Sequence, residues 1–116
     1  MLTTQTLQGH SIVNGAPREG KGESFYGIEA ATGARLEPVY RCATLEDLNL
    51  AADLADEAFA VYRKTTGRER AAFLRRIADG IEAIVPEIVE RANRETALPE
   101  ARLKGEATRT INQLRL

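Results

Sequence analysis

Few residues of this 116-residue sequence belong to the types that perform covalent chemistry: Cys42 is its single cysteine and His10 its single histidine. A reactive thiol needs a base or a positive field to form the thiolate, and the adjacent Arg41 would point to the opposite face of a strand. Because free cysteine is among the most buried residue types, we expect Cys42 to be structural and buried. His10 has no second ligand beside it and is expected to be inert. We therefore predict no catalytic residue and no metal site.

Two further patterns resemble binding motifs without completing them. Gly20 and Gly22 begin a G-x-G-x-x-G pattern, but the third glycine is missing, so we predict no phosphate loop and no cofactor-binding residue. Four arginines between residues 68 and 76 share their helix with Glu69 and Asp79 and have no aromatic platform, which is typical of a solvated face. The formal net charge of -1 argues against a nucleic-acid partner, which would require an excess of Lys and Arg.

The last segment of the sequence has two faces of different character. Gly105, Arg109 and Gln113 are spaced by four residues, so on a helix they form one stripe. A separate apolar stripe consists of Leu103, Ala107, Ile111 and Leu114. Such a helix can pack on one side and line a groove with the other. Glycine inside a helix costs about 1 kcal/mol relative to alanine, which favours a close approach at Gly105, the alternative being ordinary solvated surface.

The elements that must position these residues begin with an antiparallel β unit over residues 11–41. Asn14 and Gly15 tolerate the positive φ of a tight turn, and Pro38, which cannot donate to a ladder, marks an edge strand. Residues 1–10 show no periodicity and are expected to be a loose lead-in. In chain order, the predicted elements are a strand at 11–13, a turn at Asn14–Gly15, a loop at 16–23 and a hairpin of strands at 24–29 and 35–40.

From Thr44 onward the apolar residues recur with a period of 3.6, which predicts helices over residues 44–116. Thr44 with Asp47, and Thr66 with Glu69, have the spacing of capping boxes. Prolines 86 and 99 suit the first turn of a new helix. The predicted helices span 45–64, 67–85, 86–96 and 99–116. The last is still running at the final residue without a cap, so we expect this chain to be part of a larger fold.

Composition predicts a thin core and a soluble chain. Aromatic residues make up 5% of the sequence, tryptophan is absent and alanine occurs eighteen times. We therefore expect apolar faces of the second and fourth helices to stay open, with self-association or marginal stability as the result. No stretch approaches the roughly 20 apolar residues of a membrane span, and the start of the sequence has no apolar leader. With a single cysteine, these features favour a cytoplasmic chain without a membrane partner.

Four motifs occur in a characteristic order: Ala31-Thr32-Gly33, Ala43-Thr44-x-Glu46-Asp47, the run from Glu69 to Asp79, and Arg94 to Pro99. From about residue 24 to residue 116 the chain closely resembles the N-terminal region of NAD(P)-dependent aldehyde dehydrogenases. Within that superfamily, residues 98–116 look most like the α-ketoglutaric semialdehyde (2,5-dioxopentanoate) dehydrogenases. The chain departs from the family at two places, with Glu29-Ala30 where Asn-Pro is usual and Ala97 where glycine is usual.

The resemblance implies an α/β parent, of which this chain would be the N-terminal segment of the cofactor-binding domain, mostly α-helical with a small N-terminal antiparallel β unit. The catalytic domain would be absent. The parent would use NADP or NAD, form a thiohemiacetal, pass a hydride to the nicotinamide and hydrolyse a thioester. In the family the residues for these steps lie downstream of the matched stretch, so the 116-residue chain alone is expected to bind no cofactor and to be inactive. Its partners would be the rest of the dehydrogenase chain and, in the parent, further copies of the enzyme.

The resemblance also implies a role for the helix with two faces. In the family, the helix that matches residues 99–116 has a face along the substrate entrance tunnel, and Gly105, Arg109 and Gln113 match that face. Arg109 would attract the distal carboxylate of the semialdehyde through a fork of two charge-assisted hydrogen bonds. The rival interpretation is a free-standing, non-catalytic helical interaction module, which would have a complete C-terminal cap and a polar outer surface.

Overall fold

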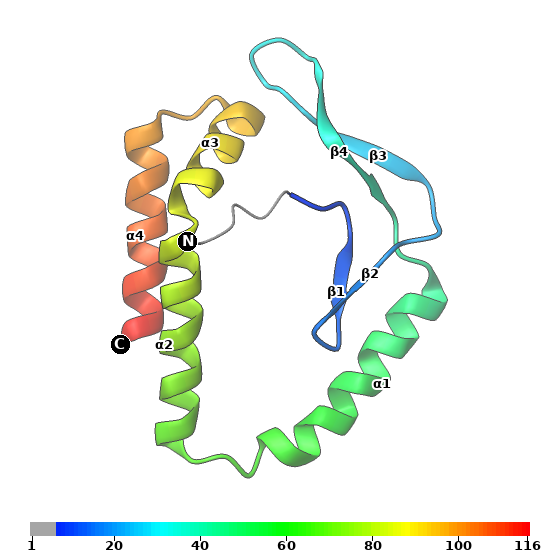
Figure 1. Ribbon diagram of the computed structural model, residues 1–116, viewed down its shortest axis with the longest axis vertical. Coiled ribbons are helices and arrows are strands. Elements are labelled where there is room, and N and C mark those ends of the chain that lie inside the picture. The colour runs from blue at the N-terminus through cyan, green and yellow to red at the C-terminus, as the bar shows by residue number, and fades with distance from the viewer. Residues whose placement is uncertain (1–6) are drawn as a thin grey trace. The chain divides into compact units, whose positions relative to one another are not determined.

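The computed structural model describes residues 7–116, which form four helices and two antiparallel strand pairs (Figure 1). This confirms a mostly helical chain with a small N-terminal β portion. Of the predicted lead-in, residues 1–6 lie outside the described residues and residues 7–10 have no regular secondary structure. β1 pairs with β2, and β3 with β4. The elements are β1 (Ser11–Val13), β2 (Ala16–Arg18), β3 (Ser24–Ile28), β4 (Arg35–Arg41), α1 (Leu45–Tyr62), α2 (Gly67–Ala83), α3 (Val85–Thr96) and α4 (Glu100–Arg115).

The first strand pair differs from the sequence prediction, because β2 occupies the start of the predicted loop at 16–23. Asn14 and Gly15 both have positive φ, 53° and 73°, so they form the tight turn that joins two hairpin strands. Pro17 faces Ile12, one position beyond the pair that closes the turn. In a two-residue hairpin this second pair is not hydrogen-bonded, so the missing amide hydrogen of Pro17 removes no ladder bond. The tight turn at Asn14–Gly15 therefore allows a strand to form at residues 16–18, although the proline and glycines of the 16–23 segment predict a loop.

The described chain divides into two compact units, and the first holds the residues up to Gly27 together with Arg35–Arg63. In this unit an ion pair joins β2 to α1, where Arg18 Nε lies 2.6 Å from Asp47 Oδ1. Asp47 is only 7% exposed and also accepts a hydrogen bond from the backbone N–H of Thr44 at 2.8 Å. The Thr44–Asp47 capping box at the start of α1 is thus confirmed, with Arg18 as an additional partner.

Cys42 is exposed, so the prediction of a buried structural cysteine is wrong. The segment that contains Gly22 and Glu23 runs beside Cys42 and contacts its backbone. The backbone N–H of Cys42 donates to the Glu23 carbonyl at 2.8 Å, and its carbonyl accepts from Gly22 N–H at 3.0 Å. A Cβ at Gly22 would lie 2.7 Å from the Cys42 carbonyl oxygen, so only glycine allows this approach. Gly22, which lies against Cys42, has no side chain to enclose the sulfur.

The second unit holds residues 28–34 and 64–116, and therefore α2, α3 and α4. α4 lies beside α2 and runs in the opposite direction (Figure 1). The small core of this unit contains Ala78, Val89 and Ile111, one residue from each helix, all at most 5% exposed. The capping box at Thr66 and Glu69 is confirmed. α3 has its proline in the first turn, as predicted, and ends at Ala97 in the left-handed conformation with φ 58°.

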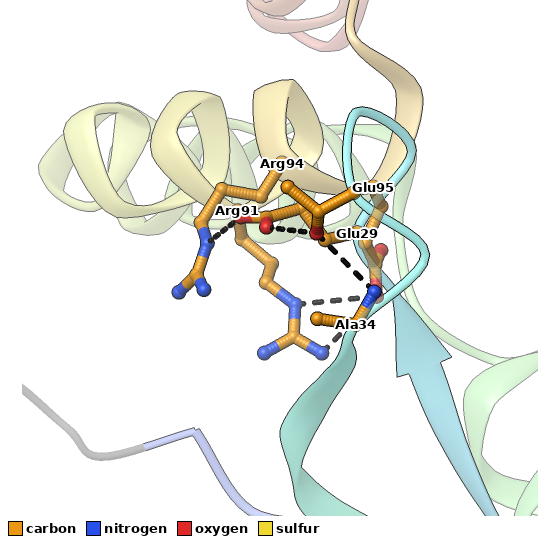
Figure 2. A network of polar contacts seen from close by, with 6 residues as sticks. Glu29, Ala34, Arg91, Arg94 and Glu95 are labelled. Carbon is orange, nitrogen blue, oxygen red and sulfur yellow. Dashed lines mark hydrogen bonds and ion pairs between the residues drawn. The ribbon is translucent and has the colours of Figure 1, made fainter.

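The tip of the β3–β4 hairpin is attached to the end of α3. Glu29 Oε1 accepts a hydrogen bond from Arg94 Nε at 3.2 Å, and the backbone N–H of Ala30 donates to the Arg94 carbonyl at 2.9 Å. Figure 2 shows Glu29 facing Arg94, with the Arg91–Glu95 ion pair on the same helix. The Thr32 hydroxyl and Arg94 together hold the pKa of Glu29 below its ordinary value. The Glu29-Ala30 departure from the family pattern thus forms a polar contact of its own.

The prediction of open apolar faces holds for α2 and fails for α4. Along α4, Ile111 is buried and the other residues of its apolar stripe are half-buried, because they pack on α2 and α3. On α2, Phe73 and Leu74 remain 53% and 41% exposed, and Ile84, which directly follows this helix, is 48% exposed. α1 also presents large apolar side chains to solvent, with Leu48 and Phe59 more than half exposed.

In the part of the chain that the structure describes, no helix is both long and apolar enough to cross a membrane.

A candidate substrate-facing surface on helix α4

Helix α4 is held in a defined orientation by its apolar side and by one arginine near its end. Ile111 is buried against the neighbouring helices. Arg115 Nη2 lies 2.8 Å from Asp79 Oδ1 and 2.7 Å from Glu82 Oε2, both on α2. The Arg115 guanidinium holds the pKa of Glu82 below its ordinary value through this hydrogen bond. With one side anchored by packing and charge, the opposite stripe of α4 must face outward.

That outward stripe borders a shallow hollow of about 380 Å³, lined by Gly105, Thr108, Arg109, Asn112, Gln113 and Leu116. The three residues predicted for the substrate tunnel, Gly105, Arg109 and Gln113, therefore lie around one surface depression. Gly105 contributes no side chain, and a Cβ built there would meet no atom within 4 Å. The close approach expected at Gly105 is therefore not made by any described residue, because the space above it is open.

Arg109 is the charged group of this surface. Its side chain is 84% exposed, and Nη2 donates to Glu106 Oε2 at 3.2 Å, one helical turn earlier. An exposed ion pair of this kind contributes between 0 and about 1 kcal/mol, so it is easily exchanged. A guanidinium carries five N–H donors, so the contact with Glu106 leaves capacity for a forked contact with a second carboxylate. A neighbouring hollow of about 420 Å³, lined by Arg109, Thr110, Gln113 and Leu114, shares two residues with the first.

Sequence reasoning missed two polar residues of the hollow, Thr108 and Asn112. The signal that could have identified Asn112 was present, since residues three apart on a helix are neighbours and Asn112 follows Arg109 by three. Thr108 is already engaged, because its hydroxyl donates to the Lys104 carbonyl at 3.0 Å. Asn112 brings a second side-chain amide to this hollow, in addition to that of Gln113.

The candidate groups of the first unit provide weaker evidence for a functional site than α4 does. His10 and Cys42 are both exposed. A hollow of about 260 Å³ in that unit is lined by Val13, Leu48 and other small residues, and its charged groups, Arg18 and Asp47, bind each other. Within residues 7–116 no group of three or more His, Cys, Asp and Glu side chains is arranged to hold a metal ion.

The N-termini of α1 and α2 are already occupied by carboxylates of the chain itself. Asp47 and Glu69 already place a carboxylate at the start of α1 and of α2. The backbone N–H of Thr44, followed by the Arg18 guanidinium, lowers the pKa of Asp47 to about 2, so it is ionised at neutral pH. Hydrogen bonds from Thr66 likewise lower the pKa of Glu69. A negative group at these two helix starts would repel a phosphate, which is the ligand that such sites otherwise favour.

Comparison with known sequences identifies the family. The aldehyde dehydrogenase family profile matches residues 18–116. The α-ketoglutaric semialdehyde dehydrogenase 2 of Azospirillum brasilense is 39% identical over 111 residues, which are 95% of this chain and 21% of that protein. An α-ketoglutaric semialdehyde dehydrogenase of Acinetobacter baylyi is 36% identical over 108 residues, 93% of this chain and 20% of that protein. The chain thus spans about a fifth of the length of these relatives.

Solved structures agree. A crystal structure of an NADP-dependent glyceraldehyde-3-phosphate dehydrogenase from Bacillus halodurans superposes with a TM-score of 0.86 and 26% identity, over 95% of this chain and 23% of that chain. A crystal structure of an NAD-dependent benzaldehyde dehydrogenase from Corynebacterium glutamicum gives a TM-score of 0.85 at 23% identity, over 92% of this chain and 23% of that chain, which shows the shared fold. This chain therefore belongs to the aldehyde dehydrogenase family and corresponds to the N-terminal region of such enzymes.

Proposed function

We propose that this chain is the N-terminal segment of the cofactor-binding domain of an NAD(P)-dependent dehydrogenase that oxidises 2,5-dioxopentanoate to 2-oxoglutarate. Relatives named for α-ketoglutaric semialdehyde support the substrate. The observation that carries the proposal is the exposed Arg109 guanidinium beside an open hollow, above a helical glycine that leaves room for a ligand.

The substrate has an aldehyde at one end and a carboxylate at the other. Arg109 binds the distal carboxylate in a fork of two charge-assisted hydrogen bonds, and this orients the aldehyde away from α4. Before substrate arrives, Glu106 keeps the guanidinium on this face of the helix. The incoming carboxylate replaces Glu106, and the exchange costs little because the exposed ion pair is weak. The role of this chain is therefore to bind and orient one end of the substrate.

The remaining parts of the reaction belong to the rest of the enzyme in this proposal. NADP or NAD is held by other segments of the dehydrogenase, and turnover requires them, so the 116-residue chain alone is inactive. The complete enzyme acts as a homo-oligomer in the cytoplasm. Support for these statements comes from the family membership of the chain and from the composition discussed above.

A chimaera tests the proposal. This chain replaces the matching 111-residue segment of the Azospirillum brasilense relative, and oxidation of 2,5-dioxopentanoate is followed by nicotinamide reduction. We expect Arg109→Ala to raise KM for 2,5-dioxopentanoate about tenfold, the effect of losing a charged hydrogen bond, and to change KM for pentanal less than twofold. Lys104→Ala, which removes a positive charge from the same helix outside the hollow, is the matched control and should affect neither substrate. Equal effects of Arg109→Ala on both aldehydes would refute the carboxylate site.

A further inference from the structure

We infer that Asn112 is a specificity-determining residue, whose side-chain amide donates a hydrogen bond to the 2-oxo oxygen of the substrate while Arg109 binds the adjacent carboxylate. The inference rests on the proposed function and extends it from a carboxylate site to a site for a 2-oxo acid. It distinguishes 2,5-dioxopentanoate from aldehydes that carry a carboxylate alone.

The placement of three residues carries the inference. Gly105, Arg109 and Asn112 lie at positions i, i+4 and i+7 of α4, so they share one face over two turns. All three line the same hollow. A Cβ at Gly105 would meet no atom within 4 Å, so the depression that the arginine and the asparagine border is open at this point. A small planar group can enter it and reach both side chains.

The chemistry of a 2-oxo acid matches this pair. Its carboxylate and ketone oxygens lie side by side at one end of the molecule, so full recognition requires a cation and a neutral donor next to each other. Arg109 supplies the cation, and the Asn112 amide supplies two N–H donors. Gln113 carries the other amide of the hollow and also borders the neighbouring hollow that it shares with Arg109, Thr110 and Leu114. Thr108 lines the hollow too, but its hydroxyl donates to the Lys104 carbonyl, so it is committed to the helix backbone. A site that hydrogen-bonds a particular substrate group discriminates against an analogue without it.

The chimaera described above provides the test, with three aldehydes of the same chain length. They are 2,5-dioxopentanoate, 5-oxopentanoate, which lacks only the 2-oxo group, and pentanal, which lacks the carboxylate as well. We expect Asn112→Ala to lower kcat/KM for 2,5-dioxopentanoate about tenfold, the effect of one hydrogen bond, and to leave 5-oxopentanoate within twofold. Thr108→Ala, which alters the same hollow, should not change the ratio between the two acids. An Asn112→Ala variant that slows both acids equally, or neither, overturns the inference.

The two proposals fail in distinguishable ways. If Arg109→Ala does not separate the two acids from pentanal, the carboxylate site of the proposed function is wrong. If Arg109→Ala separates them but Asn112→Ala does not separate the acids from each other, only the present inference is wrong.

Discussion

At the scale of single residues, Ala97 is the position where backbone conformation and residue type disagree. It closes α3 with φ 58°, and its N–H donates to the Asn93 carbonyl at 2.8 Å. A residue with a Cβ in this conformation is strained by about 1–2 kcal/mol, whereas glycine adopts it freely. We expect Ala97→Gly to raise the free energy of unfolding by about 0.5–1 kcal/mol, measured by urea denaturation. Ala72→Gly, on the exposed side of α2, is the control and should lower it by about 1 kcal/mol.

Asp47 makes stability depend on pH in the acid range. Its pKa is about 2 in the folded chain, against 3.8 as its ordinary value, because Thr44 and Arg18 stabilise the ionised form. The unfolded chain therefore binds more protons between these values, so the stabilisation is complete above about pH 4 and is lost as pH falls toward 2. We expect the melting temperature to fall over that interval. The Asp47→Asn variant should be less stable at pH 7, and its melting temperature should fall less between about pH 4 and about pH 2. Asp53→Asn is the control, and its melting temperature should fall as much as that of the unchanged chain.

At the scale of the helix, Gly105 makes α4 less stable than alanine would, and it leaves the surface above the helix open. Alanine at this position would meet no atom within 4 Å and would favour the helix by about 0.5–1 kcal/mol. We expect Gly105→Ala to stabilise the chain by that amount in urea denaturation. In the chimaera the added methyl group should raise KM for 2,5-dioxopentanoate several-fold, because it narrows the hollow. Gly80→Ala on α2, where space is also open, should stabilise equally and leave KM unchanged, and a Gly105→Ala variant with unchanged KM would argue against the site.

The starts of the helices were predictable because their determinants are local. Thr44 with Asp47, and Thr66 with Glu69, act through hydrogen bonds between residues three apart, so both boxes can be identified from spacing alone. The predicted ends of α1 and α2 lie two residues beyond the observed ones, since helix ends depend on weaker signals. The partner that Arg18 provides for Asp47 lies 29 residues away, and no local pattern predicts it.

At the scale of the whole molecule, the described chain leaves several large apolar side chains in solvent, among them Leu48, Phe59, Phe73 and Ile84. Contiguous exposed apolar surface promotes association. We expect the 116-residue chain to bind the dye ANS and to show a sedimentation coefficient that rises with concentration. Phe73→Ser should reduce both effects, whereas Thr108→Ser, an exposed polar exchange, should change neither. A monomer with a sharp, cooperative melt and no dye binding would favour the free-standing interaction module instead.

The sequence by itself determined the helical periods, the capping boxes, the turn at Asn14–Gly15 and the family. These depend on residue types and on contacts within about one turn of chain. It also placed Gly105, Arg109 and Gln113 on one stripe, since helical spacing alone settles that relation.

Only the tertiary structure decided which stripes are covered. Burial depends on segments distant in sequence: Ile111 is buried because α2 and α3 lie against it, while Phe73 on α2 remains 53% exposed. Cys42 is exposed where Gly22, a residue without a side chain, lies against it, and the space above Gly105 is open because no described segment crosses it. Such outcomes depend on which parts of the chain meet in space, and neither the hydrophobic period nor a residue's average burial contains that information.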